Sequence, residues 1–431
     1  MSIYDNAGVA LIPSGTKASK LYSVLPANGD GDFTHSRGST ATRVNKDGLI
    51  ESVATNVPRL DYPLIDGVVQ DCPALLLEPS RTNYLERTEE FSNSYWTKYN
   101  SSVSANQVVS PDGAVTADKL IENTVNTQHE IGRAFGFTSG LTYVVSVFAK
   151  SSERNLQIRG GNTNTFPANA NFDLSNGTIQ STSLGTAYIE DYGNGWYRCM
   201  VKATAAASST TNVNFRLVNG TLSTYTGDNS SGVFLWGAQN EIGLYPTSYI
   251  PWDGSGSTTR SADVCNSSGT SADFNDSEGV LFAEIAALAD DLTFRQISIS
   301  DGTNSNIVQL RYRSTSNVLQ ALLYVGGVGE VYGVTLSDIT TSSKTALKYK
   351  ENDVAFWVDG FERVVDNSAS TFSDGTLDTL RFQRGDGVNN FYGKTKQLMT
   401  FKTALTDSEL ETLTSWDSFN AMAKGQLYTI E

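Results

Sequence analysis

Short segments in which apolar and polar residues alternate, separated by turns of glycine, asparagine and aspartate, fill most of the chain after residue 80. The segment NVNFRL at residues 212–217 alternates in this way, which predicts a strand with one buried face and one wet face. Residues 354–365 show the same pattern on both sides of an Asp-Gly pair, a strong hairpin signal. Residues 81–250 contain no sustained helical period, so the sequence predicts antiparallel β-sandwiches.

The chain of 431 residues is long enough for two to three domains. We predict an all-β protein with two antiparallel, jelly-roll-like β-sandwiches preceded by an extended, largely irregular N-terminal arm. The predicted units are, in chain order, the arm at residues 1–80, the first sandwich at 81–255, a Gly/Ser-rich linker at 256–275, the second sandwich at 276–416 and a C-terminal tail at 417–431. One short helix is expected where Thr406 and Glu409 form a capping box.

The composition favours a folded protein that does not bind nucleic acid. Hydrophobic residues make up 39% and charged residues 18% of the chain, as in folded domains. The formal net charge of −15 disfavours a nucleic acid partner, which normally requires a basic face. Cys72, Cys199 and Cys265 are far apart, so we expect free thiols rather than disulfides or a zinc site.

No targeting or membrane segment is expected. The first residues, MSIYDNAGVALIPSG, lack the basic region and long apolar core of a signal peptide. No segment approaches the ~18 apolar residues that a membrane span needs. The sequence therefore predicts synthesis in a cytoplasm and no membrane insertion.

Several stretches carry a resemblance to a known class of protein. They are EEFSNSYWTKYN and VSPDGAVTADKLIENT within residues 89–124, YIEDYGNGWYRCMVKATA at 188–205 and GVFLWGAQNEIGLYPTSYIPWDGSGSTTRSADV at 232–264. They resemble the carbohydrate-binding-module-like β-sandwich common in phage tail and head-fibre proteins. The earlier SRGSTATRV, GLIESVATNVPRLDY and LLLEPSRTNYL look like the segment that precedes such domains. Residues 276–415, with ALKYKENDVAFWVDG and ALTDSELETL, resemble a concanavalin A-like, laminin-G-like sandwich.

This resemblance implies a structural virion protein, a phage tail or head fibre or decoration, made in the host cytoplasm. It implies a homotrimer that attaches to other virion proteins through the N-terminal arm and presents lectin-like sandwiches to host cell-surface glycans. Apolar residues of the arm, such as Leu49, Ile50 and Val53, cannot form a core alone, so we expect them to dock on neighbouring subunits or on the following domain. An arm that packs only on its own chain is the alternative. A secreted bacterial lectin is a third hypothesis, which the lack of a visible signal peptide disfavours.

Enzyme signatures are sparse, so we expect no catalytic residues and no enzyme. No GxSxG or HExxH motif occurs, and the two histidines, His35 and His129, are far apart. Glu284, Asp290 and Asp291 form the nearest carboxylate cluster, but their spacing departs from the alternating run of sandwich glycosidases. The alternative function is a polysaccharide depolymerase, a glycosidase or lyase, of a phage tail.

Aromatic side chains are the candidate carbohydrate-binding residues, because sugar rings stack on aromatic faces. Trp96, Tyr99 and Trp252 lie in polar, turn-rich contexts that favour exposure, whereas burial in a core is the alternative for each. Trp357 is expected to point to the opposite sheet face from its neighbours, toward a concave face or a second core layer. We expect no cofactor. Structural calcium is the one metal considered, at the turns 28–32 and 273–276.

Overall fold

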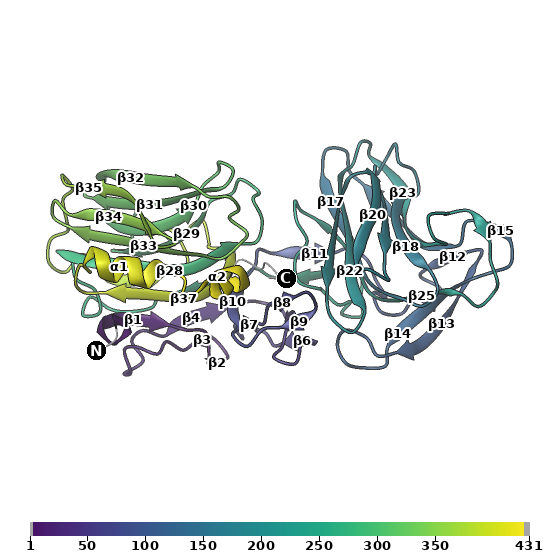
Figure 1. The fold of residues 1–431 in the computed structure, drawn as a ribbon, viewed down its shortest axis with the longest axis horizontal. Helices are drawn as coiled ribbons and strands as arrows, with labels where there is room; N and C mark the ends of the chain where they lie inside the picture. The colour runs from purple at the N-terminus through teal and green to yellow at the C-terminus, as the bar shows by residue number, and fades with distance from the viewer. Residues whose placement is uncertain (1–2, 426–431) are drawn as a thin grey trace.

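Two β-sandwiches lie side by side in the computed structural model, which describes residues 3–425 (Figure 1). The strands pair in antiparallel fashion throughout both sandwiches. The prediction of an all-β fold with two antiparallel sandwiches is therefore confirmed.

The first sandwich consists of two six-stranded sheets that enclose one apolar core. One sheet has the order β12 (Thr97–Tyr99), β16 (Glu130–Phe137), β23 (Ser209–Val218), β18 (Asn155–Gly160), β19 (Asn169–Asp173), β20 (Thr178–Leu184). The other has the order β13 (Ser101–Val108), β14 (Ala117–Glu122), β25 (Gly232–Ile242), β17 (Thr142–Ser151), β22 (Trp196–Thr204), β21 (Thr186–Asp191).

The second sandwich pairs an eight-stranded sheet with a five-stranded one. The larger sheet has the order β35 (Phe361–Asp366), β34 (Val354–Val358), β33 (Ser343–Lys350), β28 (Glu278–Ala287), β37 (Gly393–Phe401), β10 (Ala74–Leu77), β7 (Arg59–Asp61), and β1 (Ala7–Leu11) also pairs with β37. The smaller sheet has the order β32 (Val328–Thr335), β31 (Val318–Val325), β30 (Ile307–Tyr312), β29 (Arg295–Ser300), β36 (Thr379–Arg381).

Residues 1–80, predicted as an extended, largely irregular arm, contribute three short strands to the larger sheet of the second sandwich. Strands β1 and β10 both hydrogen-bond to the edge of β37 that faces away from β28. Strand β37 lies some 320 to 390 positions later in the chain than its two partners, and β7 extends the same sheet. Side chains of these strands, including Val9, Leu11 and Leu75, are fully buried in the core of the second sandwich. The first residues complete this sheet because β37 would otherwise present unpaired backbone groups. The alternative, packing on the same chain, is confirmed for these strands.

Another part of the N-terminal region lies between the two sandwiches, as Figure 1 shows for β6, β8, β9 and β11. Small sheets involve this region. One joins β2 (Thr16–Lys17), β3 (Lys20–Leu21), β4 (Phe33–Ser36) and β27 (Val264–Asn266), and the two-stranded ones pair β5 (Ala41–Val44) with β6 (Ile50–Val53), β8 (Leu64–Ile65) with β9 (Val68–Val69) and β11 (Arg81–Asn83) with β26 (Thr258–Arg260). A further two-stranded sheet, β15 (Asn126–Thr127) with β24 (Tyr225–Thr226), comes from the chain of the first sandwich. The predicted linker at 256–275 therefore contains two strands, β26 and β27, which pair with β11 and β4.

The predicted hairpin and helix near the C-terminus are confirmed. Strands β34 and β35 form the expected hairpin around Asp359 and Gly360. Helix α1 (Asp407–Thr414) begins after Thr406, whose side chain and that of Glu409 form the capping box. A 3-10 helix, Ile3–Asn6, and helix α2 (Phe419–Gly425) lie near the chain ends. The last part of the predicted tail, residues 426–431, lies outside the described residues.

Within residues 3–425, none of the helices has the length and apolar character needed to cross a membrane.

Candidate functional site: a cleft between the sandwiches

A buried ionic cluster joins the N-terminal region to the segment after the first sandwich. Arg37 and Arg59 both donate hydrogen bonds to the Asp263 carboxylate, and Nη1 of Arg37 lies 2.9 Å from Oδ1. Arg59 also binds Glu78, with 2.6 Å between Nη1 and Oε2, and Arg260 lies 2.9 Å from the same oxygen. The exposed fractions of these side chains do not exceed 3%.

This ionic cluster explains the sequence motifs that carry the phage-fibre resemblance. Arg37 comes from SRGSTATRV, Arg59 from VPRLDY, Glu78 from LLLEPSRTN, and Arg260 and Asp263 from TTRSADV. Burial alone would raise the pKa of Glu78, but attraction to Arg260 and Arg59 and hydrogen bonds from Ser248 lower it from 4.5 to about 2. Buried charges need this degree of pairing, so these motif residues have a structural role.

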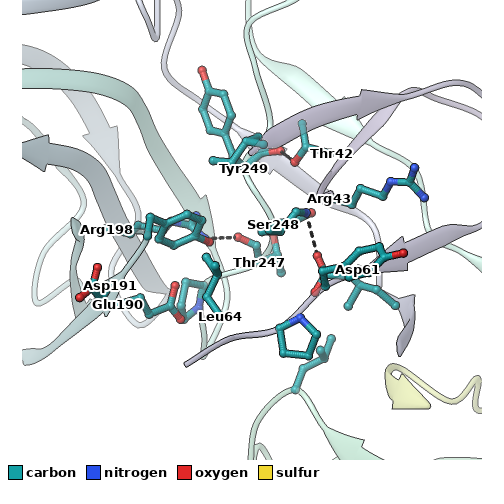
Figure 2. Close-up of a pocket in the computed structure, with 18 of the residues that line it drawn as sticks. Thr42, Arg43, Asp61, Leu64, Glu190, Asp191, Arg198, Thr247, Ser248 and Tyr249 are labelled. Atoms are coloured by element: carbon teal, nitrogen blue, oxygen red, sulfur yellow. Dashed lines mark hydrogen bonds between the residues drawn. The ribbon is translucent and has the colours of Figure 1, made fainter. Parts of the chain in front are cut away.

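A polar cleft of about 630 Å³ opens beside the ionic cluster, where the two sandwiches and the N-terminal region meet. Figure 2 shows Glu190, Asp191 and Arg198 on one side of the cleft and Arg43 and Asp61 on the other. The lining residues are Thr42, Arg43, Val44, Ile50, Asp61, Tyr62, Pro63, Leu64, Asp66, Leu76, Glu78, Asn176, Gly177, Ile189, Glu190, Asp191, Tyr192, Tyr197, Arg198, Pro246, Thr247, Ser248, Tyr249, Ala287, Leu288, Thr340 and Lys394.

The outer face of the first sandwich forms one wall of the cleft. Glu190 on β21 lies directly opposite Arg198 on β22, so their side chains share one sheet face. Arg198 is 3% exposed, and its Nη1 donates to the backbone oxygen of Thr247 at 2.8 Å. Its guanidinium also lies 5.5 Å from the centre of the Phe148 ring. These contacts hold Arg198 in place at the cleft wall.

Residues from the N-terminal region and the second sandwich form the opposite wall. Asp61 on β7 accepts a hydrogen bond from the backbone N–H of Val44 at 2.9 Å and pairs with Nζ of Lys394 at 3.1 Å. Enclosure by protein would lower the pKa of Lys394, but attraction to Asp61, and also to Glu190 and Glu78, raises it. About 40% of the Lys394 side chain is exposed, so this ammonium group faces the cleft.

The close contact of one turn with the first sandwich shapes the cleft further. The β8–β9 hairpin turns through Gly67, which has a φ of 72°. A Cβ atom at Gly67 would lie 2.6 Å from Oδ1 of Asp191 and 2.8 Å from Cα of Gly193. Only glycine combines this backbone conformation with such a close approach.

A second, smaller hollow of about 270 Å³ lies beside Trp252. It shares Tyr249 with the cleft and is lined by hydroxyl-bearing residues from both the N-terminal region and the segment after the first sandwich. The Arg87 guanidinium covers the Trp252 ring at 4.1 Å from its centre, and the indole N–H donates to the Gly256 oxygen at 3.1 Å. Trp252 is the only one of the four predicted aromatic residues that lines either hollow.

Two of the predicted sugar-binding residues are buried: Trp96, for which exposure was predicted, and Trp357, for which a second core layer was one of the two predicted places. Trp96 is 1% exposed, packs 5.0 Å from the Phe91 ring in the first core and donates its indole N–H to the Arg87 oxygen at 2.9 Å. The ring of Trp96 belongs to the buried core of the first sandwich. Trp357 is 7% exposed and packs in a cluster with Leu410 and Leu413 of α1.

Tyr99 lies apart from the cleft, on the edge strand β12. It is 38% exposed, and its hydroxyl accepts a hydrogen bond from the Asn212 side chain at 2.9 Å. The structure therefore does not bring the four predicted aromatic residues together into one site.

The predicted carboxylate cluster has separate partners. Asp291 pairs with Arg295 at 2.8 Å, Asp290 accepts from the Ser316 hydroxyl at 2.5 Å, and Glu284 is 4% exposed, with Lys396 at 3.6 Å. Across residues 3–425, no group of three or more His, Cys, Asp or Glu side chains is arranged to hold a metal ion. In the first of the two turns considered for calcium, residues 28–32, Asp32 accepts a hydrogen bond from the backbone N–H of Ser23. Calcium at this turn and at residues 273–276 stays a prediction.

The cleft residues were missed because they come from distant parts of the sequence. Arg198 gives the one local signal, an arginine between Tyr197 and Cys199 in a strand that is otherwise largely buried. An arginine in such a strand needs partners on the outer sheet face. The sequence does not identify those partners, because Thr247 approaches Arg198 through tertiary packing.

Comparisons with known proteins give matches to solved structures alone, at low similarity. No family model and no curated protein matches this chain. Among solved structures, a Ruminococcus gnavus IT-sialidase CBM40 bound to α2,3-sialyllactose is 15% identical with a TM-score of 0.29, and the match covers 33% of this chain and 84% of that one. Domains LG4-5 of the mouse laminin α1 chain are 11% identical with a TM-score of 0.24, covering 65% of this chain and 89% of that one. A heptameric SAP-like pentraxin from Limulus polyphemus is 12% identical with a TM-score of 0.27, covering 33% and 72%.

Proposed function

We propose that this protein is a non-enzymatic glycan-binding protein and that the glycan occupies the cleft between the sandwiches. The observation that carries the proposal is the cleft itself, about 630 Å³ in volume and formed jointly by both sandwiches and the N-terminal region. This volume lies within the range of roughly 300–1,000 Å³ that is typical of ligand sites in proteins.

The chemistry of the cleft wall suits a ligand with many hydroxyl groups. Tyr62 and Tyr192 contribute rings with a polar end, and such rings serve both stacking and hydrogen bonding. Glu190 and Lys394 contribute an acceptor and a donor from opposite walls. The ionic cluster behind the cleft holds the walls in a fixed relation, which lowers the entropy lost on binding.

A glycan array probed with the full chain tests this proposal, followed by calorimetry on the hits. Replacing Glu190 and Lys394 together by alanine should weaken binding about tenfold or more, because each removed hydrogen bond contributes ~0.5–1.5 kcal/mol. Lys350→Ala is the control, since this half-exposed lysine pairs with Glu278 and does not line the cleft. Unchanged affinity in the double variant, with loss in Trp252→Ala, would place the glycan in the second hollow instead.

The sequence resemblance supports a further part of the proposal, a role in a phage particle. We propose that the protein is a virion component, made in the host cytoplasm, that assembles as a homotrimer and contacts host surface glycans. Attachment through residues 1–80 is not part of this proposal, because strands from this region belong to the second sandwich of the same chain. Light scattering should give three times the chain mass of 46.5 kDa, and a monomer at micromolar concentration would contradict the trimer.

The alternative function, a polysaccharide depolymerase, is favoured by one observation only, the presence of several carboxylates in the cleft. Asp61 is paired with Lys394 and accepts a backbone N–H, so both of its carboxylate oxygens are already engaged within the protein. A reducing-sugar assay on each glycan that binds separates the two functions. We expect no release of sugar ends, and sustained turnover would replace the binding proposal by the enzymatic one.

A further inference from the structure

The charges that line the cleft are unequal in number. Five carboxylates line it, those of Asp61, Asp66, Glu78, Glu190 and Asp191. Three cationic side chains line it, those of Arg43, Arg198 and Lys394, which leaves an excess of two negative charges (three minus five).

Pairing within the walls accounts for some of these charges. Glu78 is held by Arg59 and Arg260 from behind the cleft. Arg43 is held by Glu51, with 2.5 Å between Nη2 and Oε1, and Glu51 does not line the cleft.

Asp61 and Lys394 neutralise each other across the opposite wall. On the wall formed by β21 and β22, two carboxylates, those of Glu190 and Asp191, lie beside the single guanidinium of Arg198. This wall therefore carries an excess of one carboxylate (two against one), and Glu190 is exposed while Asp191 is partly exposed.

We infer that the cleft selects uncharged or amino-bearing glycans and rejects glycans that carry carboxylates. This inference rests on the proposed function and names its ligand class. A sugar carboxylate placed beside Glu190 and Asp191 would meet like charges in a partly desolvated site, where repulsion is stronger than in water. A hydroxyl or an ammonium group would instead donate hydrogen bonds to the same oxygens.

The charge of the whole chain acts in the same direction. The formal net charge of −15 gives the protein a negative field at long range, which slows the approach of polyanionic glycans at low salt. Specificity of this kind depends on a repulsive element in addition to attractive contacts. Glu190 and Asp191 supply the local repulsive element.

Pairs of oligosaccharides that differ only in one carboxylate test the inference, each pair scored by calorimetry at low salt with the full chain. We expect the acidic member to bind about tenfold more weakly, or worse, than its neutral partner, a difference that corresponds to ~1.4 kcal/mol. Replacing Glu190 by Gln and Asp191 by Asn together should reduce the difference in affinity between the acidic and the neutral member to about threefold or less. Higher salt should also reduce this difference in affinity, because it screens the repulsion between charges.

The double substitution Glu330→Gln and Glu362→Gln is the matched control. It changes the net charge by the same amount, and both glutamates are exposed on the second sandwich, outside the cleft. We expect this control to keep the difference in affinity that the unmodified chain shows.

Equal or tighter binding of the acidic members would overturn the charge selection and leave the proposed function intact. If the control variant reduced the difference in affinity as much as the Glu190 and Asp191 variant, the selection would not come from these two residues. Failure to bind any glycan would overturn the proposed function, and the inference with it.

Discussion

Arg37 donates a hydrogen bond of 2.9 Å to Asp263 across 226 positions of sequence, and both side chains are fully buried. Asp263 also accepts from Arg59 and from the backbone N–H of Glu78, and Nε2 of His35 lies 3.3 Å from its Oδ1. One carboxylate therefore joins the first strands of the chain to the segment between the sandwiches. This relationship fixes the place of the N-terminal region and, with it, one wall of the cleft.

Replacing Asp263 by Asn should destabilise the protein strongly. The change leaves buried arginines without a counter-charge, which typically costs ~3–5 kcal/mol. Urea unfolding followed by tryptophan fluorescence measures the loss. Asp386→Asn is the control, because Asp386 pairs with Arg384 at the surface and such pairs contribute ~1 kcal/mol or less. Equal losses in the two variants would contradict the structural role of the ionic cluster.

Acid should weaken the fold through Glu78. Its pKa is lowered from 4.5 to about 2 in the folded protein, so the folded state binds this proton less readily than the unfolded state. The stabilisation is complete above pH 4.5 and is lost as the pH falls toward 2. The free energy of unfolding should therefore fall between about pH 5 and pH 2, and it should fall less steeply in Glu78→Gln. Parallel pH profiles for the two proteins would rule out this contribution.

The first strand should stabilise the second sandwich. Leu11 is fully buried in the core of that sandwich, whereas its neighbour Ile12 is 44% exposed. Leu11→Ala should cost ~2–5 kcal/mol because it leaves a cavity. Ile12→Ala should change the free energy of unfolding by about 0.5 kcal/mol or less. If Leu11→Ala were as mild as its control, the pairing of β1 with β37 would not contribute to the native fold.

Two of the aromatic residues should differ sharply in their effect on stability. Trp96→Ala should cost ~3–5 kcal/mol, because the ring fills the first core. Tyr99→Ala should cost about 0.5 kcal/mol or less, because the residue lies at an exposed sheet edge. Thermal unfolding of both variants measures the difference. A mild Trp96 variant would indicate that this tryptophan is exposed in solution.

Gly67→Ala should disturb the cleft more than the rest of the fold. The added methyl group would meet Asp191 and the backbone of Gly193 in a backbone conformation that alanine adopts with strain. We expect weaker glycan binding than in the unmodified chain. As a control, Gly302→Ala has a similar φ of 82° but open space around its Cβ, and it should leave binding unchanged. If neither variant lost glycan binding, the β8–β9 hairpin would not shape the site.

Local sequence patterns predicted the elements that depend on near neighbours. The capping box at Thr406 and the hairpin at Asp359-Gly360 both involve groups a few positions apart, so the residues present determine them. The exposure of Trp96 was predicted wrongly, because a polar turn can carry its one aromatic ring either into solvent or into a core. The choice depends on whether the core has space for that ring.

By itself, the sequence determined the all-β class, the alternation along the strands and the position of α1, because these follow from local hydrogen bonding and from the period of apolar residues. Tertiary structure alone decided that β1 and β10 complete a sheet with β37, and that Asp61, Glu190 and Lys394 face one cleft. Contacts across hundreds of positions leave no period in the chain. They form because unpaired strand edges and buried charges must find partners, and the sequence does not show which partners come within reach.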